Sequence, residues 1–178
     1  MKRFLSEWRN FVVREALSDY SIDEDIRLYH YARSDENRLT LDPEYFLSKG
    51  SAYTRNDFNR SQLPRVFFYT DLDHAEAIVK QDATLYSTTV PASQIYDLQT
   101  DPLSLAEKAI RYPGIAASLD YDLLLRSLAG IFPSSWKTKT LLPPDAAPYN
   151  GVFYSLARMD VVVWFRPIEV ERFSVEGD

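Results

Sequence analysis

The first candidate for a chemical role is His30, which lies in the apolar and aromatic run IRLYHYA, residues 26–32. The residue types of this run predict a strand. Side chains alternate along a strand, so His30 is expected to share a face with Leu28 and Ala32. An imidazole there either bonds a backbone carbonyl in the core or serves a site as a hydrogen-bonding group or a base.

Among the carboxylates, Asp160 stands out because it directly precedes VVVWF, residues 161–165, the most apolar of the predicted strands. Such a residue either begins a strand at the surface or points into a cleft. Asp97 and Asp101 in IYDLQTDP are alternative acids, although their place before a predicted helix favours a turn and an N-cap. His74 has acidic neighbours on a predicted helix, which favours a surface position.

The composition excludes several classes of site. The chain has 178 residues, no cysteine, five glycines and a formal charge of −6. Cysteine chemistry is therefore absent, and no GxGxxG, GxxxxGK[ST], GxSxG or HExxH motif occurs. We predict no metal. The acidic charge argues against a general nucleic-acid or membrane surface, and no apolar run approaches the roughly 18 residues that would span a bilayer. A cytoplasmic protein without membrane association is expected.

The first 25 residues are predicted to form a separate unit. Within residues 3–18, large apolar side chains recur at helical spacing, as an amphipathic helix requires. This helix either packs on the domain or docks a partner. Polar turn-forming residues follow it, so we divide the chain into an N-terminal helix with its connection, 1–25, and one domain, 26–178.

Beyond residue 25 the sequence predicts an α+β domain of small, mostly antiparallel sheets with flanking helices. Residues 41–64 are polar and mixed, with short helical turns at best. A loop is expected over 131–150, where Trp136, Lys137 and Lys139 either recognise a target or lie on a plain surface. Strands are expected at 26–32, 65–70, 83–90, 94–100, 151–157, 160–166 and 168–173, and helices at 71–81 from an Asp71 N-cap, at 101–112 with Pro102 in the first turn, and at 119–130 ending at Gly130.

The order of four segments resembles the ADP-ribosyltransferase-like superfamily. They are LYHYA, then FFYTDLDHAEAI, then LYSTTVPASQIYDL, then YNGVFYSLARMDVVVWFRP. Members of that superfamily carry a histidine on a first strand, an aromatic residue on a second strand and an acidic residue in a late hairpin. Each motif is short, so the resemblance depends on their order over residues 26–172.

The resemblance implies a cleft that binds NAD and cleaves its bond to nicotinamide, with transfer of ADP-ribose to an unidentified protein or nucleic-acid target. It implies His30, Tyr69 and Asp160 as catalytic residues. The acid is aspartate where the family has glutamate. A carboxylate stabilises the oxocarbenium-like ribose that forms as nicotinamide leaves. The residues implied to contact NAD are His30, Tyr31, Tyr53, Arg55 and Phe68.

Several positions depart from the family pattern or stay open. Tyr31 stands where many members have glycine. The stacking aromatic is Phe68 in an ungapped alignment, with Tyr69 and Tyr53 as alternatives, and at most one of Phe68 and Tyr69 can face the cleft. Basic side chains near these strands either bind the diphosphate or are surface charges. They are Arg33, Arg55, Arg60 and Arg65.

Two further hypotheses stand beside the transferase. The first is a non-catalytic binding or structural protein that keeps the fold, which the departures at Tyr31 and Phe68 favour. The second concerns origin, because FLSEWRNFVVREAL resembles the short amphipathic N-termini of tailed-phage open reading frames. This likeness implies a phage-encoded protein in the host cytoplasm, and it is compatible with a transferase.

Overall fold

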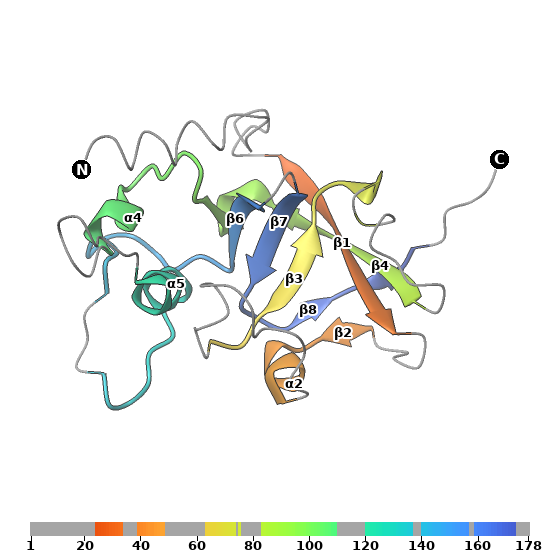
Figure 1. Cartoon of the computed structure of the whole chain (residues 1–178), viewed down its shortest axis with the longest axis horizontal. Helices are drawn as coiled ribbons and strands as arrows, with labels where there is room; N and C mark the ends of the chain where they lie inside the picture. Colours follow the sequence, from red (N-terminus) through yellow and green to blue (C-terminus); the bar gives the residue numbers. More distant parts are fainter. Residues whose placement is uncertain are drawn as a thin grey trace.

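A computed structural model describes residues 24–33, 39–48, 63–73, 75, 83–109, 120–136, 140–156 and 159–173. These residues form an α+β protein whose main sheet has seven strands in the order β5-β6-β7-β3-β1-β4-β9. Neighbouring strands are antiparallel except for β5 and β6, which are parallel. A second, two-stranded sheet pairs β2 with β8 (Figure 1). The coarse α+β prediction is therefore confirmed.

The strands are short apart from two long neighbours, β1 and β4. Their bounds are β1 Asp25–Arg33, β2 Thr40–Leu41, β3 Val66–Tyr69, β4 Ala83–Pro91, β5 Ile95–Asp97, β6 Gly151–Leu156, β7 Met159–Trp164, β8 Ile168–Glu169 and β9 Glu171–Arg172. The helices are α2 Pro43–Ser48, α4 Leu105–Lys108 and α5 Tyr121–Ala129, with a 3-10 turn, η3, at Ala92–Gln94.

Alternation along the strands gives the main sheet two buried faces. On the first, which we call the α5 face, Val152, Val161 and Val163 pack with residues of α4 and α5. On the second, the His30 face, the core residues include Phe68 and Val162. Segments from α2, β2 and β8 cover the second face with side chains that include Leu41, Phe46 and Ile168. Figure 1 shows α4 and α5 grouped at one side of the sheet and α2, β2 and β8 grouped at another.

Most predicted elements of the domain are confirmed where the structure describes them. The run RVFFY forms β3, whose residues alternate between buried and partly exposed. Helix α5 begins after Asp120, whose side chain accepts a hydrogen bond from Leu123 N, and ends at Gly130. Gly130 has a φ of 66°, a left-handed conformation that favours glycine. At Asp71 the side chain accepts a bond from Asp73 N, as the predicted N-cap requires.

Three predicted elements differ from the structure. Of the strand expected at 94–100, only Ile95–Asp97 form β5, because Gln94 belongs to η3 and residues 98–100 form a turn. The helix expected over 101–112 begins only at Leu105, so Pro102 precedes it instead of lying in its first turn. Asp101 and Ser104 have φ angles of 44° and 52°, and these left-handed residues cannot belong to a right-handed helix. The single strand expected at 168–173 is divided into β8 and β9, because β8 pairs with β2 and β9 pairs with β4.

The predicted N-terminal helix at 3–18 lies outside the described residues, so its docking role and the boundary at residue 25 stay predictions. In the segments that the structure describes, no helix is long and apolar enough to cross a membrane.

Candidate functional site

The three strands expected to carry the site are consecutive neighbours in the main sheet. Strand β3 lies between β1 and β7, and it is antiparallel to both. Tyr29 of β1 is opposite Tyr69 of β3, which in turn is opposite Val161 of β7. This register sets His30 beside Phe68 in one row across the sheet.

His30 is 8 % exposed and lies near the middle of β1. Its Nδ1 is 2.8 Å from the carbonyl oxygen of Phe67. A carbonyl can only accept, so Nδ1 carries the proton and donates it, and in the neutral ring Nε2 bears the lone pair. The imidazole also meets two rings, with centroid distances of 5.4 Å to Phe46 and 5.6 Å to Phe68. The backbone-carbonyl alternative for this histidine is therefore present, and the surrounding rings bury the imidazole.

Asp160 lies at the beginning of β7 on the His30 face. Alternation along β7 places it with Val162, which belongs to the core of that face. Its carbonyl oxygen accepts a bond from Thr70 N at 3.3 Å, and its partner in β6 is Ser155. His30 is two strands across and two residues along, which corresponds to about 12 Å between Cα atoms. His30 and Asp160 therefore lie on the same face of the sheet, and Asp160 is partly exposed.

The candidate aromatic residues are not equivalent. Phe68 shares the face of His30, but it is 0 % exposed, so its ring is already covered by protein. Tyr69 packs against the core of the α5 face, where burial raises the pKa of its hydroxyl. Alternation along β1 also turns the Tyr31 side chain away from the His30 face. Tyr53, together with Arg55, lies outside the described residues.

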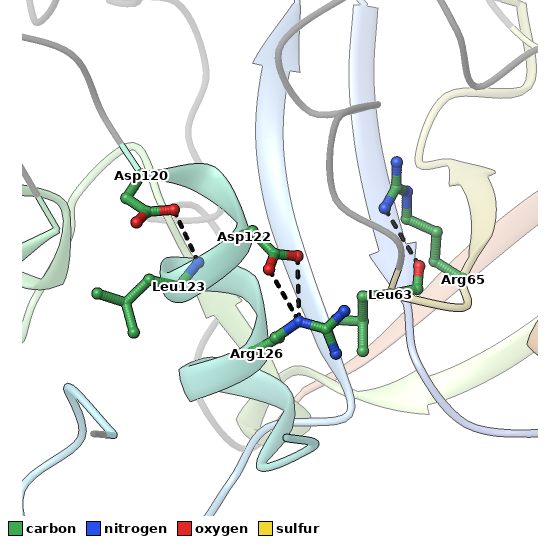
Figure 2. A network of polar contacts seen from close by, with 6 residues as sticks. All are labelled: Leu63, Arg65, Asp120, Asp122, Leu123 and Arg126. Atoms are coloured by element: carbon green, nitrogen blue, oxygen red, sulfur yellow. Dashed lines mark hydrogen bonds and ion pairs between the residues drawn. The ribbon is translucent and has the colours of Figure 1, made fainter. Parts of the chain in front are cut away.

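Of the basic residues, Arg65 lies on the face opposite to His30. It is 2 % exposed, and its Nη1 donates to Leu63 O at 3.2 Å (Figure 2). Its guanidinium lies 5.7 Å from the centre of the Phe67 ring. Burial raises the pKa of Tyr154 on the same face, and the positive charge of Arg65 opposes this rise. Arg65 is therefore not placed for a ligand on the His30 face. Arg60 is outside the described residues, as is the Arg33 side chain.

Asp97 and Asp101 have structural roles, as their spacing favours, although the N-cap of α4 is Ser104 and not Asp101. The Asp97 carboxylate accepts a hydrogen bond from Gln99 N at 2.8 Å and closes a turn. The Asp101 carboxylate accepts bonds from Leu105 N and Ala106 N at 2.8 and 3.1 Å, at the beginning of α4, and also from the Tyr96 hydroxyl. Neither needs a catalytic role to explain its place.

The described part of the loop at 131–150 is fastened to α5. Leu141 N donates to Ser127 Oγ at 3.0 Å, and Tyr149 N donates to Leu128 O at 2.8 Å. Trp136 lies 5.7 Å from the Arg126 guanidinium, which also pairs with Asp122 (Figure 2). Target recognition by this loop stays a prediction, and Lys137 and Lys139 lie outside the described residues.

Sequence reasoning missed Phe46, which stands on α2 beside His30. Alternation and strand content point to strand residues, whereas the polar stretch at 41–64 gave little reason to expect a ring over the imidazole. The signal available in the sequence was the pair of adjacent aromatic residues, Tyr45 and Phe46. In the structure their ring centroids are 5.7 Å apart.

Within the described ranges, no group of three or more histidine, aspartate or glutamate side chains could hold a metal ion. Comparisons of the chain with protein-family models, curated proteins and solved structures found no match.

Proposed function

We propose that this protein is an NAD-dependent ADP-ribosyltransferase of the ADP-ribosyltransferase-like fold, which cleaves the bond between ribose and nicotinamide. The observation that carries the proposal is the adjacency of β1, β3 and β7, with His30 and Asp160 on one face. These strands are distant in the sequence, so the local sequence pattern of each strand does not account for their adjacency. The resemblance concerns the order of these segments along the chain, and their adjacency in the sheet supports the proposal.

Asp160 is the catalytic acid of this proposal. When nicotinamide leaves, positive charge develops on the ribose, and a fixed carboxylate nearby stabilises that charge as it forms. The backbone of Asp160 is held in the sheet by β3 and β6, so its carboxylate begins from a defined position. A group fixed before reaction needs little rearrangement during it.

His30 orients the sugar. Its Nδ1 donates to Phe67 O, and this bond fixes the orientation of the imidazole ring. Phe46 is partly exposed and lies 5.4 Å from the imidazole, whereas Phe68 is fully covered. We therefore assign the ring contact with nicotinamide to Phe46, together with Tyr53 as the alternative from the sequence.

A second candidate function is a non-catalytic binding or structural protein with the same fold. The observation that favours it is the burial of His30 and Phe68, since an 8 % exposed imidazole bonded to a backbone carbonyl is also an ordinary core residue. This candidate predicts either NAD binding without nicotinamide release or no NAD binding.

The test compares nicotinamide release from NAD by the wild type, Asp160→Asn and Asp122→Asn. Asp122 is the matched control because it is a partly exposed aspartate on α5 that pairs with Arg126 at 3.0 Å. We expect Asp160→Asn to lower the rate by about 10²-fold or more, as loss of a preorganised electrostatic group does. Asp122→Asn should keep the wild-type rate. Equal rates for the wild type and Asp160→Asn would remove Asp160 from the reaction.

A further inference from the structure

Arg126 is a buried arginine on α5, the helix that packs on the face of the main sheet opposite to His30. It is 8 % exposed, and arginine is rarely buried unless its donors are paired. Its Nε donates to both carboxylate oxygens of Asp122, at 3.1 and 3.0 Å. This ion pair along the helix holds the guanidinium at Nε, and the two terminal nitrogens lie at its other end.

The terminal nitrogens of Arg126, Nη1 and Nη2, have no hydrogen-bond acceptor in the part of the chain that the structure describes. By contrast, Arg166 Nη2 donates to Ala129 O at 3.0 Å. Neither Nη1 nor Nη2 belongs to the unpaired side-chain nitrogens that protein covers completely, so both reach the surface. Figure 2 shows them directed away from the helix. Four N–H donors of a buried guanidinium are therefore open to an external acceptor.

Two aromatic rings from the loop after α5 lie beside these donors. The Arg126 guanidinium carbon is 5.7 Å from the centre of the Trp136 ring, and the Phe132 ring centre is 6.3 Å from that of Trp136. Both rings are partly exposed. Trp136 N donates to Pro133 O at 2.9 Å, and this bond closes the turn that joins the two aromatic residues. The free donors and the exposed rings thus form one surface.

We propose that Arg126, Trp136 and Phe132 form a binding site for a ligand that carries a phosphate or carboxylate group on a flat aromatic body. Nη1 and Nη2 form a fork that matches two oxygens of either group. The aromatic body contacts the exposed parts of the two rings. Because Asp122 balances the charge of Arg126, the geometry of the fork selects the ligand. The site lies on α5, away from the His30 face, so the inference is independent of the proposed function.

The experiment measures the Kd of phenyl phosphate, benzoate and inorganic phosphate for the full chain by calorimetry. We expect phenyl phosphate to bind about fivefold more tightly than inorganic phosphate, because the rings add an aromatic contact. Arg126→Lys should weaken phenyl phosphate about tenfold or more, since it keeps the charge and loses the fork. Arg166→Leu, the control, removes a positive charge near the end of α5 and should keep the wild-type Kd. The tighter of phenyl phosphate and benzoate identifies the anionic group.

Nuclear magnetic resonance of ¹⁵N-labelled tryptophan locates the bound probe. Phenyl phosphate should shift the indole signal of Trp136, assigned with Trp136→Phe, and leave that of Trp164 on the His30 face in place. The inference is overturned if neither aromatic probe binds the wild type, or if inorganic phosphate binds as tightly as phenyl phosphate. An unchanged Kd in Arg126→Lys, or an equal loss in Arg166→Leu, would overturn it too. None of these results changes the expectation for nicotinamide release.

Discussion

The two faces of the main sheet use polar residues differently. On the α5 face, several polar groups have local structural tasks. Asp101 and Asp120 cap helices, Ser127 fastens the following loop, and Arg126 pairs with Asp122. On the His30 face, a buried imidazole bonded to Phe67 O and the carboxylate of Asp160 near the start of β7 lie along the same sheet. Two polar side chains from strands that are distant in the sequence share this face, and this arrangement is the stronger indication of function.

Among the substitutions that test this comparison, we expect Phe68→Ala to have the largest effect, a loss of stability. Its ring is fully buried, so Phe68→Ala should lower the free energy of unfolding by about 3–5 kcal/mol, the usual loss for a buried aromatic residue. Tyr69→Ala, one position along β3 and partly exposed on the α5 face, should cost less. Urea denaturation of both variants measures the difference. If Phe68→Ala were as stable as the wild type, the ring would be available to a ligand after all.

A smaller effect concerns the tyrosines of the α5 face at high pH. Burial raises the pKa of Tyr154, and burial together with Asp101 raises that of Tyr96. Unfolded tyrosine titrates near pH 10, so the unfolded chain loses these protons first. The contribution to stability is full below about pH 10 and declines above it, by up to about 1.4 kcal/mol per pH unit for each tyrosine.

Denaturation of the wild type and Tyr154→Phe from pH 8 to pH 11 checks this expectation. The variant lacks one titrating group, so its stability should fall less steeply with pH. Identical slopes would show that Tyr154 titrates alike in the folded and unfolded chain.

Local signals in the sequence predicted most elements of the domain. A continuous apolar run after Pro64 indicated β3, and Gly130 marked the end of α5. The exceptions have physical causes. The start of α4 depends on left-handed residues that composition does not indicate, and the division between β8 and β9 depends on pairing with two distant strands.

The candidate site was predictable only in part. Alternation showed that Phe68 and Tyr69 face opposite ways, but which of them shares a face with His30 depends on the register of β1 against β3. Long-range pairing also brings β7 beside β3. Phe46 belongs to a short helix, where no periodicity distinguishes it from its neighbours.

The most direct test of the central claim is nuclear magnetic resonance of the chain labelled with ¹⁵N in its histidines, during titration with NAD. Only His30 and His74 give signals, and His30→Asn assigns them. We predict that NAD shifts the His30 imidazole signals and leaves those of His74 in place. Saturating NAD that moves neither set of signals, or moves His74 alone, would contradict an NAD site on the His30 face.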